Sequence, residues 1–203
     1  MILIKLNFGC FRQMFYGWLN IDILDMAGYA KAFGFEFMKL DVRKPLPFPD
    51  NYADLIYHCH LIEHLTVEQA LSFLRECHRI MKNEAVMRIV TPDLDVILNL
   101  YLKGMMDELN DAQPEIYRKF KSQSMKFSLF IFGNIGYTQE NYRGHFMIYN
   151  YNSLKELLEI AGFNKIYKMT SWSSKSPILQ KELDEGIVYD MWSKHSLIAE
   201  VIK

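Results

Sequence analysis

The chain has 203 residues, of which 50% are hydrophobic and 14% aromatic, so it can bury a substantial core and is expected to form one domain. A formal net charge of −1 gives no broad positive field, so no nucleic-acid partner is expected. No apolar run reaches the ~18 residues of a membrane span, and three widely spaced cysteines suit a reducing compartment. We therefore expect a cytoplasmic protein with no membrane partner.

The first elements have a pattern typical of a nucleotide-binding sheet edge. Residues 3–7 are expected to form a strand that enters a turn at Gly9 and Cys10, and a second strand, residues 18–21, is followed by Asp22. The carboxyl ends of neighbouring parallel strands meet at one edge of a sheet. There, turn amides can bind an anionic group and Asp22 can accept hydrogen bonds from ribose hydroxyls.

This opening departs from the dinucleotide-binding motif. Phe11 stands two residues after Gly9, so Gly-x-Gly-x-x-Gly is absent. The connection to Asp22 is also short, which leaves room for a helical turn or two at most. Taken alone, the segment also fits an ordinary strand–turn–strand with a surface aspartate.

A third strand again ends in a carboxylate. Residues 24–33 have helical spacing and stop at Gly34, and residues 36–40 read as a strand followed by Asp41 and Val42. In a nucleotide site Asp41 could accept from an exocyclic amine while Val42 packs on a base. The alternative is that Asp41 caps a loop.

The middle of the chain continues the strand–helix alternation. A proline-rich loop at 44–51 precedes a strand at 54–59. A helix is expected to begin at Thr66, with Gln69 completing a capping box, and to end near Asn83, which suits the left-handed C-terminal position. The next strand is expected over 85–90, and such units favour a parallel sheet with right-handed crossovers.

An insertion and a closing strand pair complete the chain. Residues 93–109 and 114–132 are expected to be two long helices, and the glycine-containing loop at 133–145 would let the insertion, 96–145, cover a substrate site; simple helical packing is the alternative. A helix capped by Asn152 and ending at Gly162 follows. Strands at 165–170 and 195–202 could pair as a wide hairpin, which makes one of them antiparallel.

These elements resemble the class I S-adenosylmethionine-dependent methyltransferase fold. The opening, Leu-Asn-Phe-Gly-Cys at 6–10 and Gly-Trp-Leu-Asn-Ile-Asp at 17–22, resembles a bacterial and archaeal family of predicted methyltransferases with a shortened first crossover. Further matches are Leu-Pro-Phe-Pro-Asp at 46–50, His-Leu-Ile-Glu-His-Leu at 60–65, Arg-Glu at 75–76, Arg-Ile-Met-Lys at 79–82, Thr-Pro-Asp at 91–93 and Ala-Gly-Phe at 161–163. The likeness is good over residues 3–95 and loose over 145–203.

The resemblance implies an α/β, Rossmann-like methyltransferase fold. It has a mostly parallel seven-stranded sheet with helices on both faces and one antiparallel strand, here in a single domain over residues 1–203. The implied cofactor is S-adenosyl-L-methionine. The residues implied to bind it are Asn7, Gly9 and Cys10 at the methionine part, Asp22 at the ribose, Asp41 and Val42 at the adenine, and Cys59 and His60 at the sulfonium.

The implied activity is methyl transfer to an O or N atom of a small molecule or a sugar or glycan precursor. His60 and His145 are the candidate catalytic residues, although His145 could also be exposed without a role. Phe11 replaces a glycine usual in the family, and a positive φ there would cost about 1–2 kcal/mol. A methyltransferase-like binding protein that has lost turnover is therefore the alternative. The oligomeric state is open, a homodimer included.

One rival motif overlaps this site. His60, Glu63 and His64 have the spacing of an inverted zinc-protease motif, in which two histidines one helical turn apart bind the metal. That motif must lie inside a helix, whereas here it directly follows a strand. Because no third ligand is evident in the sequence either, no metal is expected.

Overall fold

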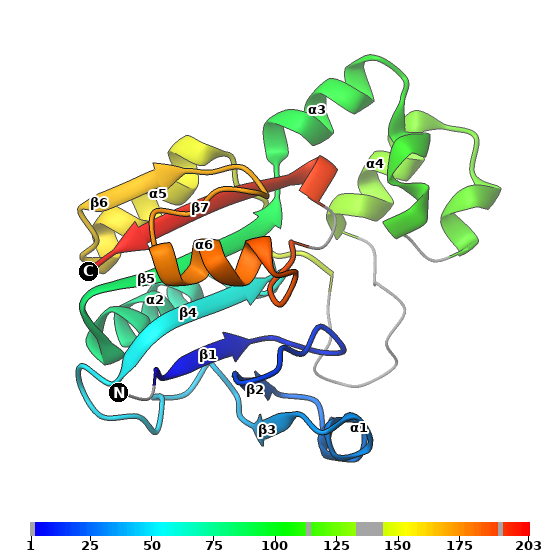
Figure 1. Ribbon diagram of the computed structural model, residues 1–203. Helices are drawn as coiled ribbons and strands as arrows, with labels where there is room; N and C mark the ends of the chain where they lie inside the picture. The colour runs from blue at the N-terminus through cyan, green and yellow to red at the C-terminus, as the bar shows by residue number, and fades with distance from the viewer. Residues whose placement is uncertain (1–2, 113–114, 133–143, 191–192) are drawn as a thin grey trace.

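A computed structural model describes residues 3–112, 115–132, 144–190 and 193–203, and its core is a single seven-stranded sheet (Figure 1). The strand order is β3-β2-β1-β4-β5-β7-β6. Only β7 runs antiparallel to its neighbours, β5 and β6, which confirms the expected topology. The strands are β1 (Lys5–Phe8), β2 (Leu19–Asp22), β3 (Glu36–Lys39), β4 (Ala53–Cys59), β5 (Met81–Pro92), β6 (Lys165–Lys168) and β7 (Ser196–Ile202).

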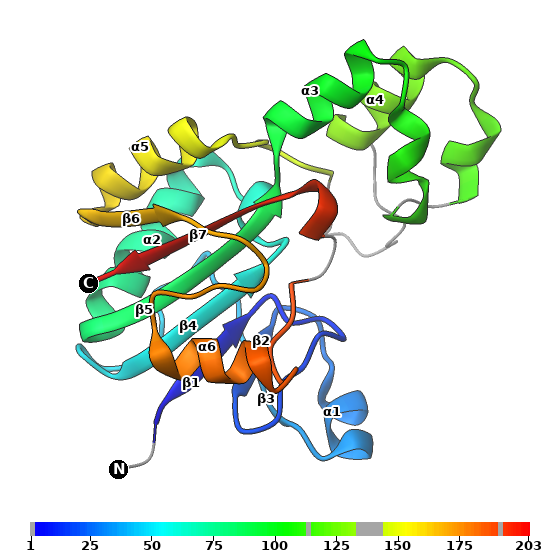
Figure 2. The ribbon, with the colours of Figure 1, turned by 45° about the horizontal axis from the view of Figure 1, so that its top comes forward.

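Helices cover both faces of this sheet. α2 (Val67–Ile80) and α5 (Tyr151–Ala161) lie on one face, and α6 (Pro177–Asp184) lies on the other (Figures 1 and 2). α1 (Ala27–Phe33) sits beside the edge strand β3. It begins later than the expected residue 24 and ends at the expected Gly34, which has φ 74°.

The central strand β4 shows how the sequence specifies these layers. Successive side chains of a strand point to opposite faces. Ile56 joins the core beneath α2 and α5, whereas Leu55 and Tyr57 join a second core beneath α6. All three side chains are at most 2% exposed, so β4 is an interior strand. Its carboxyl end therefore opens between two packed layers, where a ligand site can form.

The helix boundaries agree with the expectations in part. Thr66 and Gln69 form the expected capping box of α2. The helix ends at Ile80, however, and Glu84, not Asn83, takes the left-handed conformation, because β5 already begins at Met81. The capping residue of α5 is Asn150, not Asn152, and its side chain accepts from the backbone N–H of Ser153.

The insertion differs from the two long helices that were expected. It consists of α3 (Leu94–Leu102), α4 (Gln123–Phe132) and two short 3-10 helices, η2 (Met106–Ala112) and η3 (Glu115–Lys119). Gly104, with φ 69°, follows the end of α3 and turns the chain. Residues 133–143 of the expected loop over 133–145 lie outside the described residues. A small core of its own holds the insertion together: Ile97, Leu100, Met106, Leu109 and Phe130.

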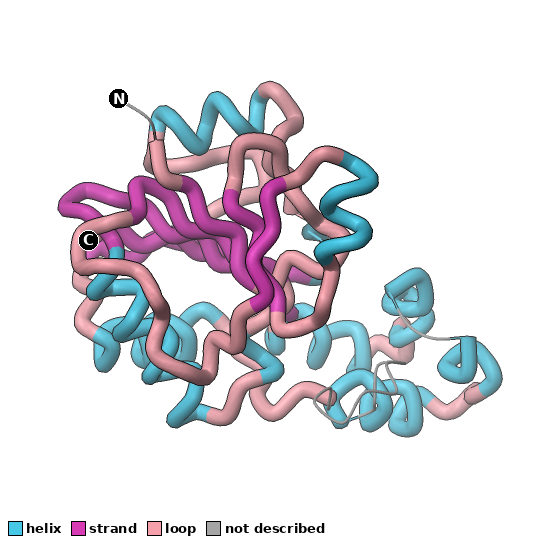
Figure 3. Tube along the Cα trace, turned by 90° about the horizontal axis from the view of Figure 1, so that it is seen from below, coloured by secondary structure: helices cyan, strands magenta, loops and turns pink. Residues whose placement is uncertain are grey.

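The insertion projects past the carboxyl end of β5, away from the body of the sheet (Figures 1 and 3). Seen from below, the twisted sheet is flanked by its helices, and the insertion lies to one side of them (Figure 3). Within the described residues, no helix is both long and apolar enough to cross a bilayer.

α6 was not expected, although the sequence carries its start signal. Ser176 accepts a hydrogen bond from the N–H of Leu179, and Pro177 occupies the first helical turn. Serine followed by proline is a favoured helix start. The acidic residues within 181–185 suggested a polar connection instead of a helix. Leu179 and Leu183 nevertheless face the sheet and make the segment amphipathic.

Candidate functional site

A pocket opens at the carboxyl ends of β1, β2 and β4. Its lining includes five of the eight residues that the resemblance implies for cofactor binding, Asp22 and Asp41 among them. The lining residues are Gly9, Asp22, Ile23, Leu40, Asp41, Val42, Arg43, His60, Leu61, His64 and Leu65. The two carboxylates lie at the ends of β2 and β3, whereas the two imidazoles, His60 and His64, follow β4.

Gly9 allows the chain to turn tightly beside the pocket. Its φ is 65°, and a Cβ at this position would lie 3.0 Å from Cβ of Leu61. Real side chains do not tolerate that approach together with a left-handed backbone. The glycine therefore keeps open the space between the β1 turn and the loop after β4.

Asp22 ties the two loops of this edge together. Its carboxylate accepts from the N–H of Phe11 at 2.7 Å and from the N–H of Leu24 at 2.9 Å. An ionised carboxylate has about four lone-pair sites, so acceptor capacity remains for a ligand. Burial raises the pKa of Asp22 above its ordinary value, and the hydrogen bonds from Leu24 and Phe11 oppose that rise.

The backbone of Phe11 has a positive φ of 40°, as considered when its replacement of a glycine was noted. The ring is not among the residues that line the pocket. It lies instead beside the guanidinium of Arg12, 5.5 Å from its carbon. The strained backbone at Phe11 thus positions its N–H to donate a hydrogen bond to the Asp22 carboxylate.

Three of the expected cofactor residues are placed elsewhere. The Asn7 amide donates to the carbonyl of Gln13 at 2.7 Å and to Oδ1 of Asn20 at 3.0 Å, which fastens the connection between β1 and β2. Cys10 is buried in a small cluster beside α1, and Cys59 is part of the core beneath α6. None of the three lines the pocket, so their contact with a cofactor remains a prediction.

Asp41 both lines the pocket and caps its own loop. Arg43 donates to the two oxygens of Asp41 at 2.8 Å each, and the N–H of Arg43 bonds to Oδ1 at 3.0 Å. The Arg43 hydrogen bonds lower the pKa of Asp41 despite some burial. The two interpretations of this acid are therefore compatible.

His60 stands at the exit of β4 with both ring nitrogens in contact. Nδ1 is 3.1 Å from Oε1 of Glu63, and Nε2 is 3.2 Å from Oγ of Ser196. Its backbone is left-handed, at φ 52°, which turns the chain sharply after the strand. The ring is thus held at the edge of the pocket by two other elements, η1 (Ile62–His64) and β7.

The short 3-10 helix η1 also shows why the zinc-protease interpretation is wrong. Glu63 and His64 lie in the single 3-10 turn η1, whereas His60 precedes it. The two histidines therefore do not sit one α-helical turn apart on a common face, as that motif requires.

Glu63 is the residue that sequence reasoning undervalued. Its side chain is fully buried, and Oε2 accepts from Oγ1 of Thr91 at 3.1 Å. Burial alone would raise its pKa, but the adjacent His60, with His64 and His145, lowers the pKa to about 2. A glutamate directly before a histidine at a strand exit was the available signal, and its complete burial could not be seen in the sequence.

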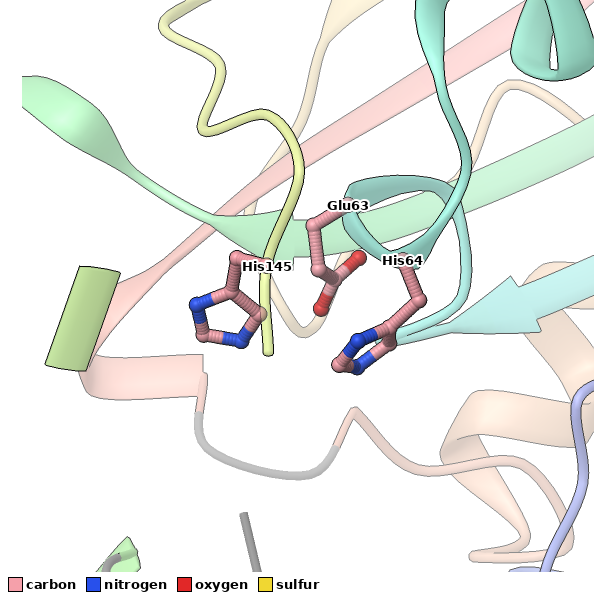
Figure 4. Close-up of side chains that lie close together, drawn as sticks. All are labelled: Glu63, His64 and His145. Atoms are coloured by element: carbon pink, nitrogen blue, oxygen red, sulfur yellow. The ribbon is translucent and has the colours of Figure 1, made fainter. Parts of the chain in front are cut away.

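His145 joins this group from a distant part of the chain (Figure 4). The backbone N–H groups of Phe146 and Met147 donate to the carbonyl of Glu63 at 2.8 and 3.3 Å, which brings the segment to η1. The His145 ring is 8% exposed, and its centroid lies 5.0 Å from that of His64. The alternative of an exposed His145 without contacts is therefore wrong.

Comparisons with known proteins agree on the type of domain. Residues 19–89 match the family model described as a methyltransferase domain. The comparison with curated protein sequences gives no significant match.

Solved structures match almost the whole chain. A SAM-dependent methyltransferase from Archaeoglobus fulgidus is 17% identical with a TM-score of 0.55, over 99% of this chain and 86% of that one. A possible histamine N-methyltransferase from Thermotoga maritima is 14% identical with a TM-score of 0.56, over 98% and 82%. PigF, described with SAH, is 13% identical with a TM-score of 0.54, over 98% and 50%. At these identities the likeness is one of fold.

Proposed function

We propose that the chain is an S-adenosylmethionine-dependent methyltransferase that methylates an O or N atom of a small molecule or a sugar or glycan precursor, because residues 19–89 match a methyltransferase domain and SAM-dependent methyltransferases share its fold. The observation that carries the proposal is the single pocket lined by Gly9, Asp22, Asp41 and His60. It combines a glycine turn, two carboxylates and a candidate base at one sheet edge, where this fold binds its cofactor.

The residues present fit S-adenosylmethionine. Asp22, buried and with acceptor capacity left, would hold the ribose hydroxyls. Asp41 and Val42 would contact the adenine, and the open turn at Gly9 would receive the methionine part. When bound, the cofactor supplies an activated methyl group on a sulfonium.

The chain's own task is then to align the acceptor and to receive a proton. Alignment of the two reacting groups supplies much of the rate in such a transfer. His60 lines the pocket, and its contacts with Glu63 and Ser196 fix the orientation of the ring. We assign His60 as the group that takes the proton from an acceptor hydroxyl or amine.

The insertion is proposed to cover the acceptor. It follows β5, and His145 at its end reaches back to η1 beside the pocket. Its own apolar core packs it as a unit separate from the cores of the sheet. A pocket closed from this side would exclude water and select a compact acceptor.

Cofactor affinity should depend on pH through Asp22. The ionised carboxylate is the form that accepts from ribose, and burial raises its pKa in the empty site. The contribution of Asp22 to cofactor affinity should therefore be fully present above this raised pKa and should be lost as the pH falls through it. Titrations at several pH values should show the ratio of wild-type to Asp22→Ala affinity shrinking toward one at low pH. A ratio that stays constant down to the ordinary aspartate pKa, about 3.9, would contradict this assignment.

Phe11→Gly should leave cofactor affinity within about twofold of the wild type, since the ring does not line the pocket and glycine adopts φ 40° freely. Equilibrium binding of S-adenosylmethionine to both proteins measures this. A gain of tenfold or more would mean that the ring obstructs the site, and would favour the alternative of a protein that has lost turnover.

Transfer itself can be tested with methyl-labelled S-adenosylmethionine. Sugar nucleotides and small molecules that bear free hydroxyl or amino groups are offered as acceptors, and label and demethylated cofactor are counted together. The proposal expects equal amounts of both with some acceptor and neither with His60→Ala. A protein that binds the cofactor but transfers no label to any hydroxyl or amine would contradict it.

A further inference from the structure

The cluster of Glu63, His64 and His145 has the composition of a metal site. One ligand atom from each of the three side chains lies within 4.8 Å of the others. The Glu63 carboxylate lies between the two imidazole rings (Figure 4). Two side chains come from η1 and the third from the distant segment that ends the insertion, so the fold assembles the group across 81 positions of sequence, from 64 to 145.

We propose that Glu63, His64 and His145 bind a divalent transition-metal ion, with Zn²⁺ the best match. Two imidazoles and one carboxylate form a ligand set that Zn²⁺ uses in catalytic sites, where a fourth position stays open. Mg²⁺ and Ca²⁺ prefer oxygen ligands and suit this set poorly.

A buried polar atom in the cluster supports the proposal. Among the described residues, Nδ1 of His145 is buried and forms no hydrogen bond, whereas Oε1 of Glu63 lies 3.1 Å from Nδ1 of His60. Buried polar atoms are normally satisfied, because leaving one without a partner costs about 1–3 kcal/mol. A metal ion would give this nitrogen of His145 a partner.

The surroundings hold the ligands in the way that metal sites require. Ligating carboxylates and histidines are usually fixed by hydrogen bonds on their other side. Thr91 donates to Oε2 of Glu63, and the His145 ring has a hydrogen bond with the backbone of Phe130.

The distances require a modest contraction. With Zn²⁺ bonds of ~2.0–2.1 Å, tetrahedral ligand atoms stand about 3.3 Å apart. The present set spans up to 4.8 Å, so the side chains must close by about 1.5 Å at most. Because His64 also lines the pocket, an open position on the ion could receive an acceptor oxygen; that use rests on the proposed methyl transfer, whereas binding of the ion does not.

Binding is best measured with Co²⁺, whose visible absorption reports the ligand geometry. The full chain, free of any polyhistidine tag and stripped with chelator, is titrated with Co²⁺ and then with Zn²⁺. We expect one equivalent of Co²⁺, with an absorption spectrum of four- or five-coordinate cobalt that Zn²⁺ abolishes. Glu63→Gln and His145→Ala should each remove this signal, whereas His78→Ala, which alters a histidine on α2 packed against Phe163, should keep it.

Thr91→Val separates metal binding from a merely structural role. It keeps the shape of the buried side chain, which is 0% exposed, and removes only the hydroxyl that donates to Glu63. Cobalt affinity should fall about 10–100-fold. Melting in chelator shows whether each variant is folded before titration.

Two results would overturn the proposal. One is the absence of stoichiometric Co²⁺ and Zn²⁺ binding by the folded wild-type chain. The other is equal binding by the wild type, Glu63→Gln and His145→Ala, which would place the ion elsewhere. Neither result depends on S-adenosylmethionine, so failure of the metal site and failure of the methyltransferase proposal remain distinguishable.

Discussion

Arg88→Ala is expected to lower the free energy of unfolding by about 3–5 kcal/mol. Arg88 lies on β5 and is paired with Asp190 at 2.6 Å and with Glu200 at 2.7 Å, and all three side chains are 0% exposed. Its guanidinium also donates to the carbonyls of Ser173 and Thr170. Removing the arginine leaves two buried carboxylates without their counter-charge, which is far costlier than losing an exposed pair.

The reason for so large an effect is the place of the cluster in the fold. Glu200 faces Arg88 across the β5–β7 pair, and Asp190 brings in the chain that follows α6. Arg88 therefore joins the antiparallel end of the sheet to the layer that covers it. Loss of the pair should loosen this layer as well as destabilise the chain.

Urea unfolding followed by circular dichroism measures the change. Lys165→Ala is the matched control, because Lys165 forms a 2.8 Å pair with Glu84 in which both side chains are exposed. Such surface pairs contribute at most about 1 kcal/mol. If Arg88→Ala cost no more than this control, the Arg88 cluster would not stabilise the sheet as we describe.

Asp22→Ala is expected to weaken binding of S-adenosylmethionine about tenfold to a hundredfold. A hydrogen bond to a charged group contributes about 1.5–3 kcal/mol, which corresponds to that loss of affinity. Asp22 is 7% exposed and lines the pocket, so water replaces the carboxylate poorly.

The variant needs a stability check, because the N–H groups of Phe11 and Leu24 both lose their acceptor. Binding is therefore measured well below its melting temperature. Asp25→Ala on the same loop is the control, since Asp25 is exposed and outside the pocket, and its affinity should match the wild type. Unchanged affinity in Asp22→Ala would remove Asp22 from the cofactor site.

Local signals in the sequence predicted most of the sheet and its helices. The alternation of apolar segments, the capping box at Thr66 and the glycines at 34 and 162 correspond to elements in the structure. The convergence of Asp22 and Asp41 also followed, because parallel strands place their carboxyl ends at one edge. These features depend on neighbouring residues and on sheet topology.

What the sequence did not predict depends on contacts between distant segments. The Asn7 amide donates hydrogen bonds to Oδ1 of Asn20 and to the Gln13 carbonyl, and no local sequence pattern predicts these contacts. His145 reaches Glu63 only because the chain after the insertion returns to η1. The apolar residues of the insertion suggested two long helices, whereas they form shorter segments around a separate core.

Titration calorimetry of the full chain with S-adenosylmethionine, and separately with its demethylated product, tests the central claim most directly. We predict saturable binding of one equivalent of each ligand, competition between the two, and a marked loss of affinity in Asp22→Ala but not in Asp25→Ala. The absence of heat and of a thermal shift with either ligand at millimolar concentration would contradict the assignment of this pocket.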